Sequence, residues 1–288
     1  MLISVITINR NNNSGLLQTI QSVEMQTSTD FEYIIVDGAS TDNSVETIRE
    51  HSSMSNLRWI SEPDTGIYNA MNKGIRMATG EYVLMLNSGD RFINQDILSN
   101  LTRYLKEKEF PDILYGNTVN TWPDGRKQRA THSDEILTMM TFYISTLDHV
   151  GTCIRRSLFD QFGMYDETMK ICSDWAWFMK TIVYGNIHPV YVNLNIVYFD
   201  MTGISESGEE NQKKIIHERR KALEDMLPPL ILADYDFYGK DALMIQRLHR
   251  HPWAYRLARL LERTLFKIEK IKKWYSRSLS RSSTKSNT

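Results

Sequence analysis

The first ninety residues alternate between strand-like runs and amphipathic stretches, and this alternation limits the folds open to the chain. The strand-like runs are 2–8 (LISVITI), 31–37 (FEYIIVD), 57–61 (LRWIS) and 81–86 (EYVLML). Between the last two, one helical stripe contains Ile67, Ala70, Met71, Gly74 and Ile75. Strands and helices in alternation favour a parallel sheet with right-handed crossovers. We therefore predict an α/β, Rossmann-like fold with a mostly parallel sheet, helices on both of its faces and a C-terminal helical extension.

The pattern loosens beyond position 90 but still contains strand and helix signals. We expect further strands at 112–117 and 188–199. A Pro-Asp-Gly turn at 123–125 indicates a hairpin. The segment SDWAWFMKTIVYG, which begins at Ser173, predicts a helix that ends at Gly185.

The charge is divided unevenly along the chain. The whole sequence has 34 Lys and Arg against 35 Asp and Glu. From Met244 to Thr288 there are twelve basic and two acidic residues, which leaves 22 basic and 33 acidic residues for 1–243. An acidic body with a basic tail suggests different partners for the two parts. We expect a domain at 1–240, with a nucleotide-binding half at 1–117 and an acceptor half at 118–205, and then a tail at 241–288.

The cysteines and the terminal sequence indicate a cytoplasmic protein. The two cysteines, Cys153 and Cys172, do not have the spacing of a metal site, so we expect two reduced core thiols. No apolar stretch reaches the roughly 20 residues that span a bilayer. The N-terminus lacks the basic region and the small-residue cleavage site of a signal peptide, which predicts a protein that is not secreted.

Polar side chains follow each of the first four predicted strands. They are Thr7, Asn9, Asp37, Asp64, Asn87, Ser88 and Asp90. In open α/β sheets, ligands bind beyond the carboxyl ends of the strands. One aspartate at such a position is most often a helix cap, but aspartates after successive strands favour a binding site.

The usual glycine-rich phosphate loops, GxGxxG and GxxxxGKS/T, are absent from the sequence. This absence disfavours a nicotinamide enzyme or a P-loop NTPase. A nucleoside diphosphate that binds without such a loop needs a metal ion to offset its charge, and Mg²⁺ or Mn²⁺ prefers oxygen ligands. Asp90, in the turn LNSGD at 86–90, is placed to hold such an ion.

Four segments, in this order, resemble the family-two glycosyltransferases with the GT-A fold. The segments are SVITINRNN, IIVDGASTDNS, EPDTGIYNAMNKGIRMATGEYVLMLNSGD and CSDWAWFMK. The similarity covers residues 1–205 and is greatest to bacterial enzymes that build polysaccharide repeat units. It implies inverting transfer of a sugar from a nucleoside diphosphate donor, with UDP favoured over GDP or dTDP, to an acceptor hydroxyl. It also implies Mg²⁺ or Mn²⁺ as cofactor.

The resemblance assigns roles to residues at the strand ends. It implies that Asp37 contacts the nucleobase and that Asp64 faces the nucleoside. The turn LNSGD takes the place of the family's acidic metal-binding triplet, of which only Asp90 remains. Asn87 and Ser88 in this turn are expected to contact ribose or phosphate.

Asp174, in ICSDWAWFMK, matches the family's catalytic base, which removes the proton of the attacking acceptor hydroxyl. A helix N-cap is the alternative for this residue. The resemblance places His149 near the diphosphate or the metal, and a structural histidine is its alternative. Lys73 is expected to reach a phosphate, with a solvated lysine as the alternative. Thr7 and Asn9 complete the expected nucleotide site.

The tail contains an amphipathic stretch at 254–275. Its apolar stripe, which lies opposite a stripe of arginines and lysines, consists of Leu257, Leu261, Leu265, Ile268 and Ile271. A basic amphipathic helix is typical of peripheral binding to an anionic membrane. Packing on the catalytic domain or on a second subunit is the alternative. We expect 278–288 to be disordered, and the acidic body disfavours nucleic acid as a partner.

We therefore predict a metal-dependent inverting glycosyltransferase at the cytoplasmic face of the membrane. It would move a sugar from a nucleotide-sugar donor to a glycan or lipid-linked acceptor in bacterial cell-surface polysaccharide synthesis. A non-catalytic nucleotide-sugar-binding or scaffold protein is the alternative, supported only by the reduced acidic triplet. A nucleotidyltransferase is disfavoured because Arg10 is the only basic residue of the loop after the first strand.

Overall fold

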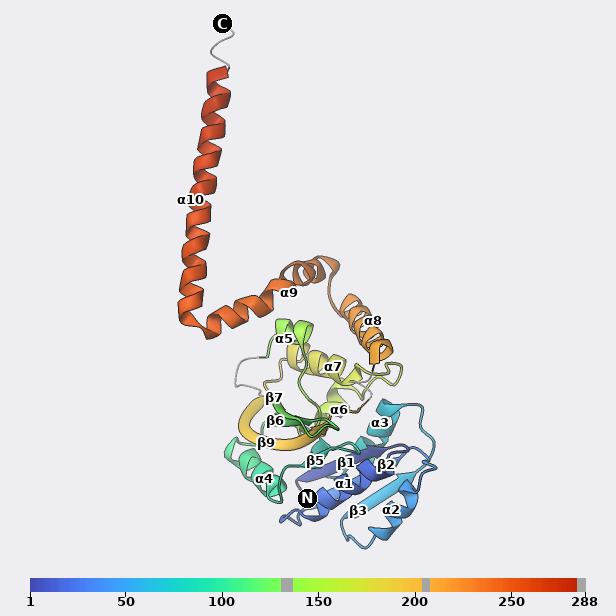
Figure 1. Cartoon of the computed structure of the whole chain (residues 1–288). Coiled ribbons are helices and arrows are strands. Elements are labelled where there is room, and N and C mark those ends of the chain that lie inside the picture. Colours follow the sequence, from blue (N-terminus) through green and yellow to red (C-terminus); the bar gives the residue numbers. More distant parts are fainter. Residues whose placement is uncertain (131–136, 204–207, 284–288) are drawn as a thin grey trace. The chain divides into compact units, whose positions relative to one another are not determined.

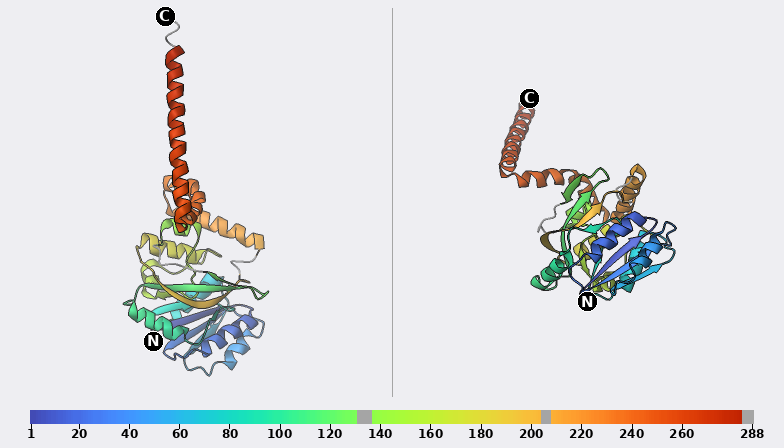
Figure 2. Two further views of the ribbon diagram at one scale, coloured as in Figure 1. Left: turned by 60° about the vertical axis from the view of Figure 1, so that its left-hand side comes forward. Right: turned by 60° about the horizontal axis from the view of Figure 1, so that its bottom comes forward.

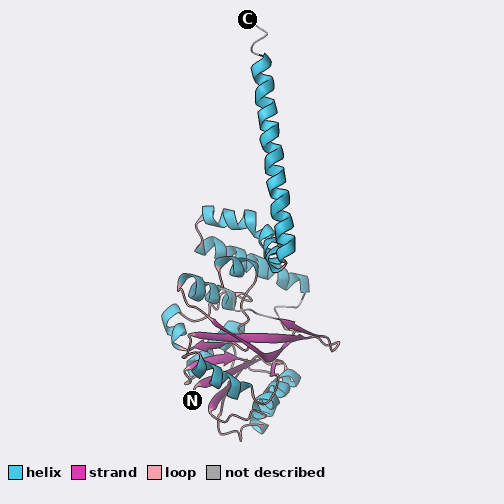
Figure 3. Cartoon of the chain, turned by 90° about the vertical axis from the view of Figure 1, so that its left-hand side faces the viewer, coloured by secondary structure: helices cyan, strands magenta, loops and turns pink. Residues whose placement is uncertain are grey.

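The structure is a computed structural model that describes residues 1–130, 137–203 and 208–283. The chain divides into two compact units, Met1–Pro228 and Pro229–Thr288. The first unit contains a single mixed sheet with helices on both sides (Figure 3), so the predicted α/β class is confirmed. Cys153 and Cys172 are buried free thiols, as the sequence predicts.

Parallel strands form the N-terminal part of the sheet. They are β1 (Ile3–Asn9), β2 (Phe31–Asp37), β3 (Leu57–Ser61) and β4 (Tyr82–Met85). All residues of β1 and β2 are buried, which explains their unbroken strand-like sequences. In the parallel register Asn9 lies opposite Asp37, and Asp37 lies opposite Ser61. The carboxyl ends of these strands therefore meet at one edge of the sheet.

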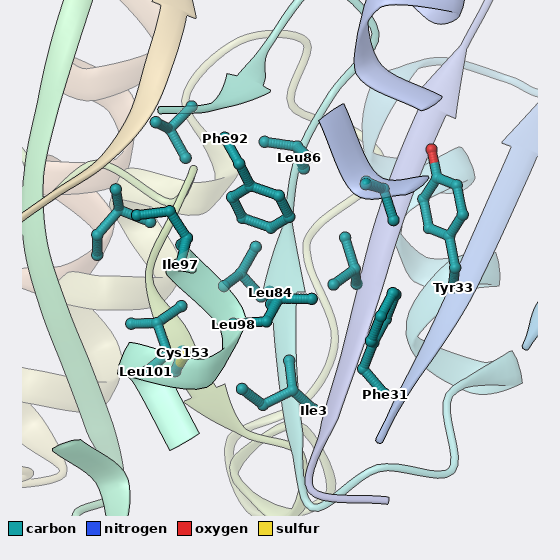
Figure 4. Close-up of a cluster of buried hydrophobic side chains, with 14 of the residues drawn as sticks. Ile3, Phe31, Tyr33, Leu84, Leu86, Phe92, Ile97, Leu98, Leu101 and Cys153 are labelled. Atoms are coloured by element: carbon teal, nitrogen blue, oxygen red, sulfur yellow. The ribbon is translucent and has the colours of Figure 1, made fainter. Parts of the chain in front are cut away.

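Helices cover both faces of these strands. They are α1 (Asn13–Glu24), α2 (Ser44–Glu50), α3 (Ile67–Met77) and α4 (Ile97–Glu107). One face packs against α1, α2 and α4 in an apolar cluster that includes Phe31, Leu84 and Leu101 (Figure 4). The other face packs against α3, where a Cβ on Gly74 would lie 2.4 Å from Ile6. Gly74 thus lets the helix backbone approach the strand closely.

The second part of the sheet is mixed. Its strands are β5 (Arg91–Phe92), β6 (Ile113–Thr121), β7 (Lys127–Ala130), β8 (Cys153–Arg155) and β9 (Val190–Asp200). β8 lies antiparallel between β4 and β6, and β7 closes the predicted hairpin with β6. β9 runs antiparallel to β5 and parallel to β6, and Figures 1 and 2 show β6 and β9 side by side. The order is β3-β2-β1-β4-β8-β6-β9-β5, with β7 on β6.

Further helices complete the first unit. They are α5 (Met139–Ile144), α6 (Ser157–Phe162), α7 (Ser173–Phe178) and α8 (Gly208–Met226). A π-helical turn, η1 (Met179–Tyr184), continues α7 as far as the predicted end at Gly185. Trp175 and Trp177 are buried, and Trp177 stacks on Phe159 with 4.5 Å between the ring centroids. Both indole N–H groups donate to backbone carbonyls, so these residues anchor α7 in the core.

The second unit consists of α9 (Pro229–Arg250) and α10 (Pro252–Ser283). The predicted apolar stripe lies on α10, and its five members, from Leu257 to Ile271, are between 43% and 61% exposed. α10 extends into the segment 278–288 for which the sequence predicts disorder, and 284–288 lie outside the described residues. Among the residues that the structure describes, no helix is both long and apolar enough to cross a bilayer.

Candidate active site

The loop after β4 buries the aspartate of LNSGD. Gly89 in this loop has a φ of +105°, a conformation that favours glycine. Asp90 is only 3% exposed, and its Oδ1 accepts the backbone N–H of Asp200 at 2.9 Å. Burial raises the pKa of Asp90 to about 7, and the charge of Asp200 acts in the same direction. The loop therefore holds a carboxyl group whose ionised form the protein alone stabilises poorly.

Asp174 lies in the first turn of α7, and the cap of this helix is Cys172. The Oδ1 of Asp174 accepts the hydroxyl of Tyr68 at 2.8 Å, and its Oδ2 lies 2.7 Å from Nδ1 of His149. Burial acts to raise the pKa of Asp174, but the charge of His149 and these hydrogen bonds outweigh it and lower the pKa. Asp174 is thus an ionised carboxylate, 13% exposed, rather than the helix cap.

His149 connects Asp174 to the loop after β4, because its Nε2 lies 3.2 Å from Nδ2 of Asn87. Burial acts to lower the pKa of His149, but the carboxylate of Asp174 prevails and raises it. A neutral ring accepts from Asn87 and leaves the buried Oδ1 of Asn87 without a partner. A charged ring would require the Asn87 amide to turn over, because two N–H donors would otherwise face each other. Both ring nitrogens are thus engaged within the protein.

Asn87, His149, Asp174 and Tyr68 therefore form one hydrogen-bonded chain from the loop after β4 to α7 and α3. Sequence reasoning did not identify Tyr68. Its hydroxyl also lies 2.5 Å from the carbonyl oxygen of Ile171, and burial raises its pKa, so the phenol stays protonated. The only sequence signal for Tyr68 is its place in the first turn of α3, where an aromatic residue is typical of the core.

The carboxylate of Asp37, at the end of β2, is saturated with hydrogen bonds. It is fully buried and accepts from Asn9 Nδ2, from the hydroxyl and backbone N–H of Ser40, and from the hydroxyl of Ser61. Burial acts to raise the pKa of Asp37, but these bonds, led by those from Ser40, lower it. Asp37 therefore ties together the ends of β1, β2 and β3. The Oδ1 of Asn9 is buried without a partner beside it.

Asp64 occupies the space that a side chain at position 38 would need. A Cβ on Gly38 would lie 2.1 Å from Oδ2 of Asp64. The other oxygen, Oδ1, accepts the backbone N–H of Gly66 at 3.1 Å and lies 3.4 Å from NH1 of Arg10. The Asp64 side chain is 6% exposed, whereas that of Arg10 is 62% exposed. The structure thus brings Asp64 and the exposed cation of Arg10 to the ends of β1 and β2.

Three other predicted residues make contacts within the protein. Thr7 is fully buried and donates to a backbone carbonyl of the loop after β4. The side-chain amide of Asn12 donates to the backbone carbonyl of Ser88, and the Ser88 hydroxyl lies 3.3 Å from the same amide nitrogen. Lys73 pairs with Glu62 at 2.7 Å. Thr7 and Ser88 hold the strand ends together, whereas Lys73 fixes the segment ahead of α3.

A glutamate of α8 holds the backbone in front of α7, and sequence reasoning did not identify it. The carboxylate of Glu218 accepts the backbone N–H groups of Lys170, Ile171 and Cys172, at 2.6, 3.0 and 3.0 Å. The adjacent guanidinium of Arg219 lies over the ring of Trp175, 4.9 Å from its centroid. α8 therefore fixes the segment that carries Asp174.

The donor set of the loop after β4 fits a hard divalent cation. Among the described residues, no group of three or more His, Cys, Asp or Glu is arranged to hold a metal ion. Mg²⁺, however, commonly uses one or two carboxylates together with substrate phosphates. Asp90 supplies a carboxylate, and Oδ1 of Asn87 is a buried oxygen without a partner. A bound cation would disfavour a second charge on His149, which keeps this oxygen free.

Comparisons with known proteins agree with this arrangement. The pattern of "Glycosyl transferase family 2" matches residues 4–168, which is more than half of the chain. The chain belongs to glycosyltransferase family 2. A PGL/p-HBAD biosynthesis glycosyltransferase of Mycobacterium bovis (strain BCG / Pasteur 1173P2) is 30% identical over 209 residues, covering 72% of this chain and 80% of that protein. The predicted family is therefore confirmed, and the non-catalytic alternative is disfavoured.

Two solved structures show the same fold. S. aureus TarS 1-349 in complex with UDP superimposes with a TM-score of 0.58 at 20% identity, over 74% of this chain and 68% of that chain. The mannosyltransferase PcManGT from Pyrobaculum calidifontis, in complex with GDP-Man and Mn²⁺, gives 0.53 at 16% identity, over 66% and 54%. This family-two glycosyltransferase thus has the predicted GT-A fold.

Proposed function

We propose that this family-two glycosyltransferase transfers a sugar with inversion from a UDP-sugar to an acceptor hydroxyl, with Asp174 as the catalytic base. The observation that carries the proposal is the partly buried Asp174 carboxylate, which His149 links to the loop after β4. A diphosphate at the strand ends would direct the anomeric carbon of the donor toward this carboxylate. UDP is supported by the structures of S. aureus TarS with UDP and with UDP-GlcNAc.

The reaction forms and breaks one bond each at the anomeric carbon. The acceptor oxygen attacks this carbon while the bond to the diphosphate breaks on the opposite face, and the nucleoside diphosphate leaves with the electron pair. Asp174 takes the proton of the acceptor hydroxyl as the new bond forms. Tyr68 and His149 hold the carboxylate in one orientation for this transfer. A divalent cation at Asp90, when bound, would offset the charge that develops on the diphosphate.

The nucleoside would lie beyond β1, β2 and β3. Because its two oxygens already accept four hydrogen bonds, Asp37 would act on the nucleobase through Asn9 and Ser40, which it holds in place. The unpartnered Oδ1 of Asn9 is available to a donor group of the ligand. Asp64 and the exposed guanidinium of Arg10 supply further polar contacts at the same edge.

The test of the proposal is the Asp174→Asn variant with a panel of UDP-, GDP- and dTDP-sugars. The variant should lose transfer by a factor of about 10² to 10⁴, because the base acts in the transition state. Binding of the UDP-sugar, measured by calorimetry, should stay near that of the wild type. Asp160→Asn, on the exposed surface of α6, is the matched control and should keep full activity. Near wild-type transfer by Asp174→Asn would exclude this residue as the base.

The basic tail is the second part of the proposal, and it would place the enzyme at the cytoplasmic face of the membrane. α10 combines an exposed apolar stripe with Arg256, Arg259, Arg263 and further basic residues. Each Lys or Arg near an anionic surface contributes about 1 kcal/mol. Lipid-linked or glycan acceptors of cell-surface polysaccharide synthesis would then lie within reach. The mycobacterial relative, a PGL/p-HBAD biosynthesis glycosyltransferase, supports a biosynthetic role.

Vesicle sedimentation tests this placement. Changing Arg256, Arg259 and Arg263 together to Gln should release the protein from vesicles that contain phosphatidylglycerol. A matched variant with the same charge change in the first unit, at exposed Lys106, Lys108 and Lys213, should stay bound. Equal binding of both variants, or equal binding of the wild type to phosphatidylcholine alone, would contradict an electrostatic anchor.

A further inference from the structure

We propose that Asp200, at the end of β9, supplies the carboxylate that the loop after β4 lacks and shares a divalent cation with Asp90. This inference rests on the proposed function, because the cation would serve the donor diphosphate. The turn LNSGD has a single acid where the family it resembles has an acidic triplet. The missing charge comes from a strand more than a hundred residues further along the chain.

The register of the sheet puts Asp200 beside this loop. β5 begins directly after Asp90, and it pairs antiparallel with β9 through Arg91 opposite Tyr198 and Phe92 opposite Val197. Continuing the same register backwards by two residues places Gly89 opposite Asp200. The backbone N–H of Asp200 donates to Oδ1 of Asp90 at 2.9 Å, which fixes the two residues together. The approach of the two residues is thus built into the strand pairing.

The Asp200 carboxylate lies where the side chain of residue 89 would lie. A Cβ on Gly89 would come within 2.7 Å of Oδ2 and 3.3 Å of Cβ of Asp200. The φ of Gly89, +105°, also disfavours any side chain at this position. An acidic side chain at position 89 would therefore clash with Asp200 where it now lies. Gly89 makes room for the aspartate of β9, which takes the place of an acidic residue in the loop.

The remaining contacts leave oxygen available for a cation. Oδ1 of Asp200 accepts the backbone N–H of Thr202 at 2.9 Å. Within the described residues, no lysine or arginine forms an ion pair with Asp200 or Asp90. The carboxylates of two residues in direct contact repel each other when both are ionised, and a divalent cation bound by both removes this cost. With the buried Oδ1 of Asn87, the site offers only oxygen ligands, which suit Mg²⁺ or Mn²⁺.

Direct binding of Mn²⁺ to the full chain tests the inference without any transfer assay. Free Mn²⁺ is measured by its electron paramagnetic resonance signal during titration of the wild type, Asp200→Asn, Asp90→Asn and Asp166→Asn at pH 8. Asp166 is the matched control, because its Oδ1 also accepts the backbone N–H two residues ahead. Asp200→Asn and Asp90→Asn should each weaken Mn²⁺ binding by at least about tenfold, and Asp166→Asn should bind as the wild type does.

Thermal unfolding separates a ligand from a purely structural residue. Mn²⁺ should raise the melting temperature of the wild type more than that of Asp200→Asn. In EDTA, Asp200→Asn should melt above the wild type, because one of two repelling charges is gone. Wild-type Mn²⁺ affinity in Asp200→Asn would overturn the inference, as would an absence of Mn²⁺ binding by the wild type. Each of these two results would remove Asp200 from the site. The proposed function would still hold if Asp174→Asn loses transfer.

Discussion

The loops after β2 and β4 occupy equivalent places at the edge of the sheet, but their aspartates have opposite surroundings. Asp37 accepts four hydrogen bonds, which lower its pKa, and it completes a network that joins three strands. Asp90 is equally buried, but burial dominates and raises its pKa to about 7. A strand-end position therefore does not decide the role of a carboxylate. Its hydrogen-bond partners do: the carboxylate of Asp37 is saturated within the protein, whereas the carboxylate of Asp90 keeps capacity for the cation that we propose.

The largest effect is expected from Asp37→Ala. Removing the carboxylate takes away four hydrogen bonds, which come from the buried amide of Asn9, from Ser40 and from Ser61. We expect the free energy of unfolding to fall by about 4 kcal/mol, since each of the four hydrogen bonds contributes about 1 kcal/mol. Equilibrium urea unfolding measures this loss. Asp124→Ala, in the exposed β6–β7 turn, is the control, and an equally small effect of both changes would show that Asp37 is not a structural centre.

Asp90→Asn should act in the opposite direction in metal-free protein. Because the folded pKa is raised to about 7, the unfolded chain releases this proton first, and stability falls as the pH rises from about 4 to 7. Each pKa unit corresponds to about 1.4 kcal/mol. Asn has no charge to bury, so the variant should be more stable than the wild type at pH 8, by up to about 4 kcal/mol, and similar at pH 4. Urea unfolding in EDTA measures both proteins at pH 4 and pH 8. A stability difference between variant and wild type that is the same at both pH values would contradict the prediction.

His149→Gln tests the third carboxylate, Asp174, whose charge is balanced by the imidazolium of His149. We expect a loss of about 3 kcal/mol, because a buried charge loses its partner. The lowered pKa of Asp174 contributes stability that is lost as the pH falls through it, and the raised pKa of His149 contributes stability that is lost as the pH rises through it. The difference between variant and wild type should therefore be greatest between these limits and shrink in alkali. A constant difference from pH 5 to 9 would exclude the ion pair.

The smallest effect concerns the backbone of the loop after β4. Gly89→Ala should destabilise the protein by about 1–2 kcal/mol, from its positive φ and its contact with Asp200. Gly125→Ala is a matched control, because Gly125 has a φ of +83° and no atom near the added Cβ. Combining Gly89→Ala with Asp200→Gly should restore part of the loss. Equal effects at positions 89 and 125 in urea unfolding would show that Asp200 does not crowd the loop.

The alternation of the first ninety residues was sufficient to predict the parallel sheet and the edge at which its polar residues gather. Local periodicity determines these features, because a strand buried on both faces needs an unbroken apolar run. The same pattern located Asp37 and Asp90, but it did not distinguish a saturated carboxylate from an unsaturated one. That difference depends on Ser40, Ser61 and the end of β9.

The rest of the site depends on contacts between distant segments. Tyr68 and Asp174 are 106 residues apart in the chain, and Asp90 and Asp200 are 110 apart. No periodicity links such pairs, and a buried tyrosine or a strand-end aspartate has an ordinary structural explanation. The family resemblance supplied Asp174. The partners that give this carboxylate its orientation and its lowered pKa became visible only in the structure.

The contact of Glu218 with three successive backbone N–H groups makes α8 part of the catalytic unit that we propose. A chain shortened to end at 205 would keep every residue that the resemblance assigns and still lose α8. The amides of Lys170, Ile171 and Cys172 would then turn to water, and the turn that aims Asp174 would lose its shape. Such a fragment should still hold nucleotide while failing to deliver its sugar. The catalytic unit that we propose therefore extends beyond residue 205, at least to Glu218 in the middle of α8.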